Sequence, residues 1–260
     1  MNLAGRTAIV TGGAGHLGAA LCEVLGELGA GVAVIDLDGD AVDQVASRVT
    51  AKFKVPTAAF KVDLTKERQV REIPKLVTRR LGRLDILVNN AALVGTSALR
   101  GWAVPLADQR SETWRKALEV NLTAAFVVSQ VCAPHLARTG RGVIVNIASI
   151  YGLVGPDMRL YSGTAMGNPA AYGVSKAGLL QLTRWLATTL APSVRVNAIV
   201  PGGIRRRQPP SFQRQYVRRT PLRRMATEED MTGAVAYLAS DLSAYVTGHT
   251  LIVDGGWTAW

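Results

Sequence analysis

Apolar, β-branched segments alternate with helical patterns along almost the whole chain. The predicted strands are Thr7–Thr11, Val32–Asp36, Thr57–Val62, Ile86–Asn89, Gly142–Ala148, Val194–Val200 and Leu251–Asp254. The predicted helices between them are His16–Leu28, Asp40–Val49, Lys66–Leu81, Ser111–Leu136, Ala171–Leu190 and Glu228–Ala239. Uninterrupted apolar strands are typical of strands that helices cover on both faces. The alternation therefore predicts an α/β fold in which helices flank a doubly wound, seven-stranded parallel sheet.

Three segments fit no regular element: Leu93–Arg110, Ile150–Pro169 and Gly202–Thr220. Loops of this length in a compact domain are usually functional. The 260 residues contain no repeat, linker or low-complexity segment, so we expect one domain over residues 1–260.

The composition is that of a globular protein, with 48% hydrophobic and 19% charged residues. The start of the chain leads straight into an apolar strand, so we expect no signal peptide. The longest uncharged helical stretch, Asn121–Ala133, is too short to span a bilayer. Cys22 and Cys132 lie in helical patterns, as buried free thiols do, and the histidines lack the spacing of metal ligands. We expect a cytoplasmic protein with no membrane partner and no metal.

The net charge of +11 comes mostly from arginine. A basic protein raises the possibility of nucleic-acid binding, but no helix-turn-helix, zinc or aromatic RNA-binding signature is visible, so we expect no nucleic-acid partner. The charge is concentrated in one 20-residue window without an acid, called the arginine window below. Its members are Arg205, Arg206, Arg207, Arg214, Arg218, Arg219, Arg223 and Arg224.

A glycine-rich turn follows the first strand. Gly13, Gly15 and Gly18 form the pattern G-x-G-x-x-G between a strand and a helix. One glycine permits the tight turn, one lets the backbone approach a pyrophosphate, and one lets the helix pack on the strand. The helix N-terminus then offers free N–H groups and a partial positive charge to phosphates. This predicts a Rossmann-like dinucleotide site, with contacts from Gly12, Gly13, Gly15, His16, Leu17 and Gly18.

Asp36 ends the second strand, 18 residues after Gly18. A carboxylate there, with Leu37 beside it, can accept hydrogen bonds from both ribose hydroxyls of NAD and would repel the extra phosphate of NADP. The alternative is a polar residue at a strand end that caps the next helix. Because the glycines precede it, we predict that the cofactor is NAD.

Two further strand ends extend the predicted cofactor site. Asp63, followed by Leu64, could meet the adenine amino group or could cap the Thr65–Leu81 helix. The small residues around Asn90, Ala91 and Ala92 would let the cofactor lie against the backbone, although an asparagine pair also suits an ordinary turn.

Tyr172 and Lys176 open a predicted helix at positions i and i+4, so they share one helix face. A free phenol has a pKa of about 10 and is a poor base at neutral pH. A nearby ammonium and a positively charged nicotinamide favour the phenolate and bring it into working range. We therefore predict that Tyr172 is the catalytic acid and base.

The pattern of Tyr172 and Lys176 alone is common in helices, but three features accompany it. Ser149 follows the fifth strand and can hydrogen-bond the reacting oxygen. Asn121 lies within the long helix, an awkward place for asparagine unless it faces a polar site. Pro201-Gly202 comes directly after the sixth predicted strand, at the carboxyl edge where ligands bind in this architecture.

On these motifs the chain resembles the short-chain dehydrogenase/reductase family over essentially its whole length. The matching pieces are Thr11–Gly18, Asn89–Ala92, Asn121, Ser149, Tyr172, Lys176, Asn197 and Pro201-Gly202. The resemblance implies that Tyr172 transfers the proton, that Lys176 lowers its pKa and holds the nicotinamide ribose, that Ser149 orients the substrate, and that Asn121 anchors a water-linked proton relay.

The resemblance implies further contacts and an assembly. Pro201, Gly202 and Ile204 would complete the cofactor site, and Ser149, Tyr151 and Arg205 would touch the substrate. Residues 202–224 would form a mobile lid, whose arginines suit an anionic substrate but could equally be a solvated or intersubunit face. The Ser111–Leu136 and Ala171–Leu190 helices would pair between subunits of a homotetramer.

The chain departs from the single-domain branch of this family in three places. The glycine spacing T-G-x-x-G-x-x-G, with His16 in it, looks like that of the longer sugar-nucleotide branch. Ser149 and Tyr172 lie further apart than usual, and the extra residues Gly155–Gly167 should cover the substrate mouth. After Pro201-Gly202, the threonine that often meets the nicotinamide amide is missing.

The leading interpretation is an NAD-dependent enzyme that interconverts a secondary alcohol and a ketone on an anionic, sugar-like small molecule. The segments Ser149–Asp157, Asn168–Tyr172 and Val253–Trp260 resemble a subgroup linked with bacterial surface-sugar and flagellin modification. One alternative is a 3-oxoacyl-acyl-carrier-protein reductase, against which Asp36 argues because such reductases usually take NADPH. The other is a non-catalytic NAD-binding sensor, against which the complete set of catalytic residues argues.

Overall fold

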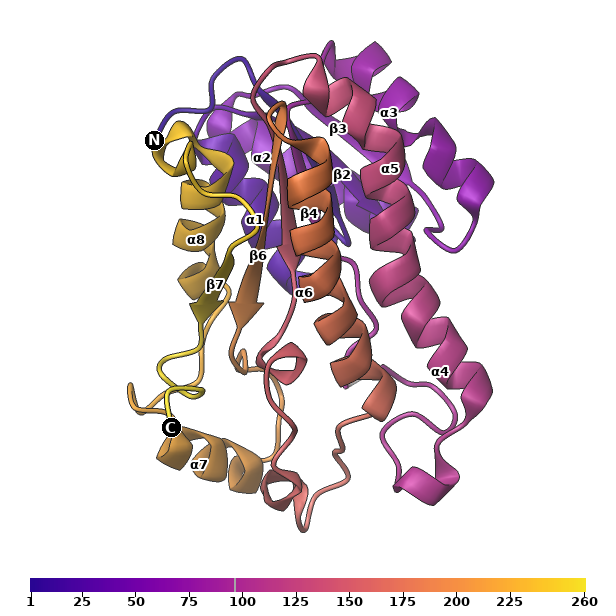
Figure 1. Ribbon diagram of the computed structural model, residues 1–260, viewed down its shortest axis with the longest axis vertical. Coiled ribbons are helices and arrows are strands. Elements are labelled where there is room, and N and C mark those ends of the chain that lie inside the picture. Colours follow the sequence, from indigo (N-terminus) through magenta and orange to yellow (C-terminus); the bar gives the residue numbers. More distant parts are fainter. Residues whose placement is uncertain (96) are drawn as a thin grey trace.

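The computed structural model describes residues 1–95 and 97–260 and contains a seven-stranded parallel sheet (Figure 1). The strands are β1 (Thr7–Thr11), β2 (Gly31–Asp36), β3 (Thr57–Lys61), β4 (Ile86–Asn89), β5 (Gly142–Ile147), β6 (Val194–Pro201) and β7 (Thr250–Val253). Their order is β3-β2-β1-β4-β5-β6-β7. The predicted fold class is confirmed, and no strand end differs from its predicted position by more than one residue.

Eight α-helices belong to the described part of the chain. They are α1 (His16–Glu27), α2 (Gly39–Phe53), α3 (Glu67–Leu81), α4 (Ser111–Leu118), α5 (Ala124–Ala137), α6 (Ala170–Leu190), α7 (Pro210–Arg219) and α8 (Glu229–Ala239). All six predicted helices have a counterpart, although α2 runs four residues beyond its predicted end at Val49.

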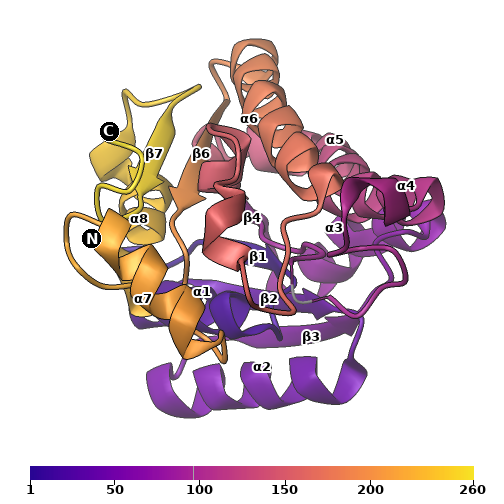
Figure 2. The same ribbon diagram turned by 90° about the horizontal axis from the view of Figure 1, so that it is seen from below.

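Alternate strand residues face two separate hydrophobic cores. Val10 in β1 joins a core with α1, α2 and α8, whereas its neighbour Ile9 joins a core with α3, α5 and α6. In Figure 2, α2 and α6 accordingly lie on opposite sides of the sheet. This two-sided burial is the reason why the strands read as continuous apolar runs.

The strand order reverses between β1 and β4. From β1 the chain builds outward through β2 and β3, and it then returns to place β4 on the other side of β1. Crossovers on either side of this point leave a crevice at the carboxyl ends of the strands, where ligands bind in such sheets. The fold thus directs attention to the loops after β1, β2, β4, β5 and β6.

The predicted helix Ser111–Leu136 is interrupted by a π-helical turn over Glu119–Thr123, which separates α4 from α5. The whole segment, Ser111–Ala137, is long and apolar enough to cross a membrane by length and composition alone, which the uncharged stretch Asn121–Ala133 is not. Its buried residues Val128 and Cys132 pack in the core against the sheet, and core helices of soluble proteins pass the same test.

The helix α7 was not predicted, because the arginine window shows no long apolar period. Pro210 occupies its first turn, where the missing N–H of proline costs nothing. Phe212 and Tyr216, four residues apart, are its buried side chains. One aromatic pair at this spacing is enough to dock a short helix on existing structure, but too little to reveal the helix in the sequence.

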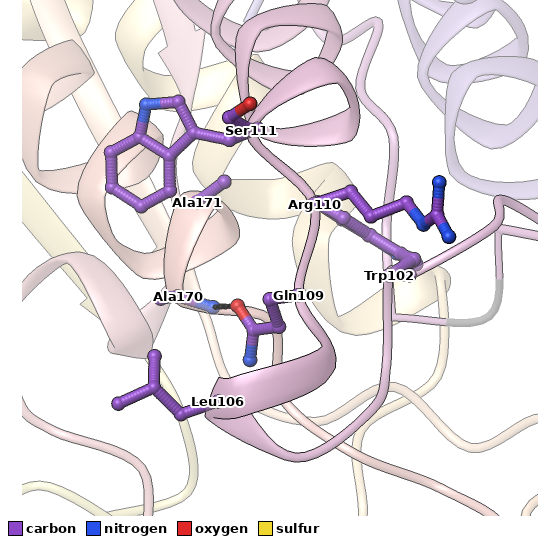
Figure 3. Close-up of a pocket in the computed structure, with 9 residues that line it drawn as sticks. Trp102, Leu106, Gln109, Arg110, Ser111, Ala170 and Ala171 are labelled. Carbon is purple, nitrogen blue, oxygen red and sulfur yellow. Dashed lines mark hydrogen bonds between the residues drawn. The ribbon is translucent and has the colours of Figure 1, made fainter.

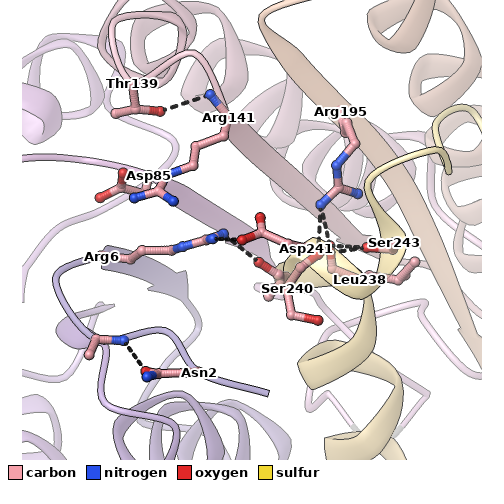
Figure 4. Close-up of polar contacts among 12 residues, drawn as sticks. Asn2, Arg6, Asp85, Thr139, Arg141, Arg195, Leu238, Ser240, Asp241 and Ser243 are labelled. Atoms are coloured by element: carbon pink, nitrogen blue, oxygen red, sulfur yellow. Dashed lines mark hydrogen bonds and ion pairs between the residues drawn. The ribbon is translucent and has the colours of Figure 1, made fainter.

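The amino ends of the strands carry a dense polar cluster (Figure 4). Arg6, before β1, donates to Asp241 at 2.5 Å. Asp85, before β4, is fully buried, accepts the Thr7 amide and pairs with Arg83. Arg195 in β6 donates to three backbone carbonyls beyond α8 and at its end. The buried charges of Arg6 and Asp85 are therefore paired, and the half-buried Arg195 is hydrogen-bonded.

Candidate active site

The glycine turn after β1 uses each glycine for a different steric reason. Gly12, which lies just before the predicted G-x-G-x-x-G pattern, has φ +62° and takes the left-handed turn. Gly13 instead packs where a Cβ would lie 2.8 Å from a Val34 methyl carbon. A Cβ on Gly18 would fall directly on the Gly12 carbonyl group. At Gly15 the nearest atom would be 3.4 Å away, so the turn is open there.

The open side of this turn meets the start of α1. The helix begins at His16, and no side chain caps its first N–H groups. His16 is exposed and Leu17 is half-buried. Uncapped N–H groups beside a glycine that leaves space are what a pyrophosphate requires, so these residues fit a dinucleotide.

Asp36 faces the same turn from the end of β2. Its Oδ2 accepts a hydrogen bond from the Ala14 amide at 3.0 Å, and its Oδ1 accepts one from Leu37 at 2.7 Å. The alternative role as a helix cap is wrong, because Asp38 caps α2 by accepting from the Ala41 amide. Leu37 is exposed at 61%, which leaves its backbone and side chain open to a ligand.

Asp63 follows β3 at the same edge. Its Oδ1 accepts hydrogen bonds from the amide and the hydroxyl of Thr65, and these bonds hold the pKa of this carboxyl below its usual value. Because α3 begins only at Glu67, Asp63 does not cap that helix and the capping alternative is wrong. Leu64, beside it, packs partly against the core.

Asn90 ties the loop after β4 to the glycine turn. Its Nδ2 donates to the carbonyls of Thr11 and Gly12, each at 3.0 Å. Ala91 packs so closely that a Cβ on Gly12 would lie 2.8 Å from its Cα. A larger residue at Ala91 or Gly12 would separate the two loops, so small side chains here, with Ala92 following, keep the crevice narrow.

Tyr172 and Lys176 lie in the first two turns of α6, as predicted. The Lys176 Nζ is 5.9 Å from the centroid of the Tyr172 ring and donates to the Ile147 carbonyl at 2.7 Å. Only 2% of Lys176 is exposed, and this burial lowers its pKa to about 8.

The pKa of Tyr172 in the protein alone is governed by burial. Burial raises it, and a hydrogen bond with Ser149 works against that rise. In the protein alone, desolvation of the phenol therefore outweighs the effect of the Ser149 hydrogen bond.

Ser149 stands directly after β5, where the chain turns into a short 3-10 helix, Ile150–Gly152. Its hydroxyl accepts from the Tyr151 amide at 3.3 Å, and the residue is buried. The hydroxyl also lies within hydrogen-bond reach of the Tyr172 phenol, so the two predicted catalytic side chains are neighbours.

Asn121 explains the π-helical turn. Its side-chain oxygen accepts a hydrogen bond from the Leu93 amide at 2.7 Å. Its side-chain nitrogen donates to the Leu93 carbonyl at 3.0 Å and to the Ser175 hydroxyl at 3.1 Å. Ser175 in turn donates to the Tyr172 carbonyl at 2.8 Å. Sequence reasoning found Asn121 but missed Ser175, whose signal was a hydroxyl on the buried face of α6. Together they connect the loop after β4 to the turn that carries the phenol.

Tyr172 packs against an apolar cluster. It contains Trp102, Ala117 and Ala171, with Trp114 and Tyr172 packed against it. Beside it, at the start of α6, lies a cavity of about 370 Å³ (Figure 3). Its lining comes from residues 101–114 and from Ala170 and Ala171, and it includes neither Ser149 nor Lys176. The part of the predicted loop from Gly101 to Arg110 thus lines a cavity at the start of the helix that carries Tyr172.

The loop after β6 lies against the end of β7. Gly202 donates to the Val253 carbonyl, and a Cβ on Gly202 would lie 2.8 Å from the Asp254 Cα. Ile204 forms an isolated bridge with Ala226. Pro201 and Gly202 therefore sit at the carboxyl edge with the other predicted cofactor residues.

The arginine window is partly neutralised by acids of the same chain. Arg206 pairs with Glu228, Arg219 with Asp157, and Arg224 with Asp230. Arg205 and Arg207 are exposed and make no ion pair with any residue in the described ranges. Part of the window is therefore structural. Arg214, Arg218 and Arg223 are, like Arg205 and Arg207, exposed and without an ion pair to any residue in the described ranges.

Comparisons with known proteins agree with this geometry. A family model described as enoyl-(acyl carrier protein) reductase matches residues 12–258. The chain is 34% identical over 263 residues to cis-4-hydroxycyclohexanecarboxylate dehydrogenase of Sinomonas cyclohexanicum, which covers 98% of this chain and 97% of that protein.

Two solved structures share the fold and differ in cofactor. A short-chain dehydrogenase from Leptospira borgpetersenii with bound NAD+ has a TM-score of 0.86 and 33% identity, over 99% of this chain and 94% of that one. A gluconate 5-dehydrogenase from Burkholderia cenocepacia in complex with NADP and tartrate has a TM-score of 0.87 and 29% identity, over 100% of this chain and 97% of that one.

Proposed function

The chain belongs to the short-chain dehydrogenase/reductase family, and we propose that it is an NAD(H)-dependent enzyme that interconverts a secondary alcohol and a ketone on an anionic, sugar-like small molecule. The observation that carries this proposal is the meeting of Tyr172, Lys176 and Ser149 at the carboxyl edge, beside an open glycine turn. Each of these groups has a distinct task in moving one proton at one oxygen.

In this proposal Tyr172 gives its hydroxyl proton to the ketone oxygen during reduction and takes it back during oxidation. Ser149 donates a hydrogen bond to the same oxygen. The nicotinamide supplies or accepts the hydride and, when oxidised, adds a positive charge that favours the phenolate. Lys176, fixed by the Ile147 carbonyl, adds its own charge below pH 8 and is placed to hold the ribose. The Asn121–Ser175 connection keeps the phenol in position.

The preference for NAD rests on Asp36. Relatives in this family are found with either cofactor, so the family alone leaves the choice open. The Asp36 carboxylate is pinned by two backbone amides toward the side of the turn where a ribose would lie, and it would repel a 2′-phosphate.

The test is Asp36→Ala, with Asp38→Ala as the control because that neighbour only caps α2. We expect Asp36→Ala to lose most of the NAD over NADP preference and Asp38→Ala to keep it. Wild-type protein that binds NADP as tightly as NAD would contradict the assignment.

The anionic substrate rests on Arg205 and Arg207. Their guanidinium groups are exposed beside the loop after β6, and arginine suits carboxylate or phosphate. The named relatives act on a hydroxycyclohexanecarboxylate and on gluconate, both carboxylates. An enzyme that uses these arginines should show a KM for its anionic substrate that rises with salt.

We would assay NAD+ reduction with gluconate, galactose, 4-hydroxycyclohexanecarboxylate and cyclohexanol. Replacing Arg205 and Arg207 by Ala should raise KM for the anionic substrates, whereas Arg68→Ala on the surface of α3 should not. Best turnover of neutral alcohols, unchanged in the double variant, would contradict an anionic substrate.

Two other functions were alternatives at the level of the sequence, and each has a specific test. The family model's description and the basic window favour an acyl-carrier-protein reductase, which would consume NADPH with a 3-oxoacyl carrier protein. A non-catalytic sensor would bind NAD and oxidise nothing on the panel. We also propose a link to surface-sugar and flagellin modification, on the resemblance of the segments Ser149–Asp157, Asn168–Tyr172 and Val253–Trp260.

We also propose a single domain over residues 1–260, with residues 202–224 as its lid, and a cytoplasmic homotetramer. Phe126 on α5 and Val174 and Trp185 on α6 are apolar and exposed, between 37% and 54%, which suits a contact between copies of the chain. Sedimentation of only monomer at micromolar concentration would contradict the assembly.

A further inference from the structure

Four polar side chains form a hydrogen-bonded row inside the hydrophobic core, between the sheet and the helices α5 and α6. The members of this polar row are Asn89 at the end of β4, Ser129 on α5, Asn146 in β5 and Thr183 on α6. None of the four is more than 4% exposed. The proposed mechanism gives none of them a task, so their burial needs a separate explanation.

The polar row is continuous from one helix to the other. The Asn89 Nδ2 donates to the Ser129 hydroxyl at 3.0 Å and to the Asn146 Oδ1 at 2.8 Å. The Asn146 Nδ2 donates to the Thr183 hydroxyl at 2.9 Å, and Thr183 donates to the Leu179 carbonyl at 2.8 Å. Asn89 and Asn146 are also direct partners in the strand register. The row therefore links α5, β4, β5 and α6 through side chains alone.

The surroundings of the row would suit apolar residues. Leu87 and Ile144, two residues before the asparagines on the same strand faces, belong to the core formed with α3, α5 and α6. A buried hydrogen-bonded pair can be replaced by apolar groups of the same shape with little change in stability. The best-attested use of such buried polar groups is to fix the register of the elements that they join. The row thus points to positioning.

The Asn146–Thr183 bond lies next to the catalytic groups. Asn146 directly precedes Ile147, whose carbonyl accepts the Lys176 Nζ at 2.7 Å, and it lies three residues before Ser149. Thr183 follows Lys176 by seven residues, which is two turns along the same face of α6. The helix that carries the catalytic lysine is therefore tied to the same two residues of β5 at two points.

We propose that Asn146 and Thr183 are positioning residues: their hydrogen bond fixes α6 against β5 in the register that presents Tyr172 and Lys176 to the substrate and the cofactor. This rests on the proposed function and adds two residues to it. Apolar contact is not directional, so an apolar pair would fill the core without selecting this register. A misplacement of catalytic groups by about 1 Å can cost roughly 100-fold in rate.

The experiment separates positioning from stability with two variants at position 183. Thr183→Val keeps the shape and leaves the Asn146 Nδ2 without its acceptor. It should lower the Tm by roughly 5 °C and lower kcat by about 10- to 100-fold. Thr183→Ser keeps the hydroxyl and should stay close to wild type in kcat. The substrate is whichever of gluconate, galactose, 4-hydroxycyclohexanecarboxylate and cyclohexanol the wild type oxidises fastest with NAD+.

The decisive variant combines Asn146→Leu with Thr183→Val and so removes both partners, while Asn89 keeps Ser129 as its acceptor. We expect its Tm to return to within about 2 °C of wild type, whereas kcat stays at least 10-fold low. The matched control is Thr189→Val. Thr189 also donates at 2.8 Å to the carbonyl four residues earlier, but it is exposed on α6 and bonds no strand.

A crystal structure of the double variant adds a readout that does not depend on turnover. We expect Lys176 to lose its hydrogen bond with the Ile147 carbonyl. Recovery of kcat together with Tm, or Tyr172 and Lys176 unmoved in that crystal structure, would overturn the positioning role. If the double variant does not fold, equal kcat per folded molecule in Thr183→Val and Thr183→Ser overturns it. Wild-type protein that oxidises none of the four alcohols would overturn the proposed function instead, and the crystal structure would still decide the role of the row.

Discussion

Gly18→Ala and Gly15→Ala should separate the two tasks of the glycine turn, folding and cofactor binding. A Cβ on Gly18 would overlap the Gly12 carbonyl oxygen. It would also lie 2.8 Å from the Gly12 carbonyl carbon and 2.8 Å from the Gly13 Cα. These are backbone atoms, which cannot move aside as a side chain can. Overpacking usually costs 1–3 kcal/mol, and we expect about 3 kcal/mol here, at the upper end.

Gly15→Ala meets a different environment. The nearest atom to its Cβ is the Gly12 carbonyl oxygen at 3.4 Å, and its φ of −68° suits any residue. The methyl group should therefore leave stability almost unchanged. It would, however, occupy the open side of the turn next to the uncapped N–H groups of α1, where the pyrophosphate is expected. We expect the Kd for NAD to rise by about 10-fold or more, which corresponds to a loss of about 1.4 kcal/mol or more of binding free energy.

Thermal unfolding of the protein without cofactor measures the first effect, and titration with NAD measures the second. For a chain of this size, 3 kcal/mol corresponds to a Tm lower by roughly 10 °C for Gly18→Ala. Gly15→Ala should unfold within about 2 °C of wild type, which is less than 1 kcal/mol. The reasoning fails if the two variants lose the same stability, or if Gly15→Ala binds NAD as well as wild type does.

Three further predictions concern the site itself. Tyr172→Phe should lower kcat by at least the 10²–10⁴-fold typical of a lost proton donor while calorimetry still detects NAD binding. Burial lowers the pKa of Lys176 to about 8, so below that pH the folded state carries a buried ammonium that the unfolded chain solvates. Lys176→Met removes this buried charge but also loses the hydrogen bond to the Ile147 carbonyl, which is worth about 1 kcal/mol. The net result should be a free energy of unfolding that is higher by roughly 2 kcal/mol at pH 7. This gain should shrink as the pH rises from 8 toward 10.5, because the folded wild-type protein then loses the charge. Asp157→Asn weakens the pairs with Arg159 and Arg219, so it should speed proteolysis of the Gly155–Gly167 segment and raise the substrate KM, at a cost of no more than about 1 kcal/mol in stability.

The sheet was predictable because its signal is repeated and two-sided. In β1 the side chains of Ile9 and Val10 enter opposite cores, so no polar residue interrupts the run. The glycine turn was predictable for the same local reason, since a strand, a turn and a helix start lie within one short segment. The turn's internal geometry was not, because the sequence cannot tell whether Gly12 or Gly13 takes the positive φ.

Other features depend on contacts between distant segments, which one sequence does not display. The helix α7 forms because Phe212 and Tyr216 find Tyr161 and Trp257, which lie about 50 residues before and 40 residues after it. The π-helical turn exists because Asn121 bonds Leu93 and Ser175 together. The raised pKa of Tyr172 depends on burial, which the spacing of Tyr172 and Lys176 cannot reveal.

The two edges of the same sheet satisfy their buried polar groups in opposite ways. At the amino edge, Arg6 and Asp85 are buried, and each is paired with another side chain. At the carboxyl edge, burial both raises the pKa of Tyr172 and lowers that of Lys176. Burial without full compensation costs stability and persists where a ligand supplies the missing partner. This asymmetry supports, without reference to any motif, our proposal that the ligands bind at the carboxyl edge. It also predicts that the protein gains more stability from binding NAD together with a substrate than from NAD alone.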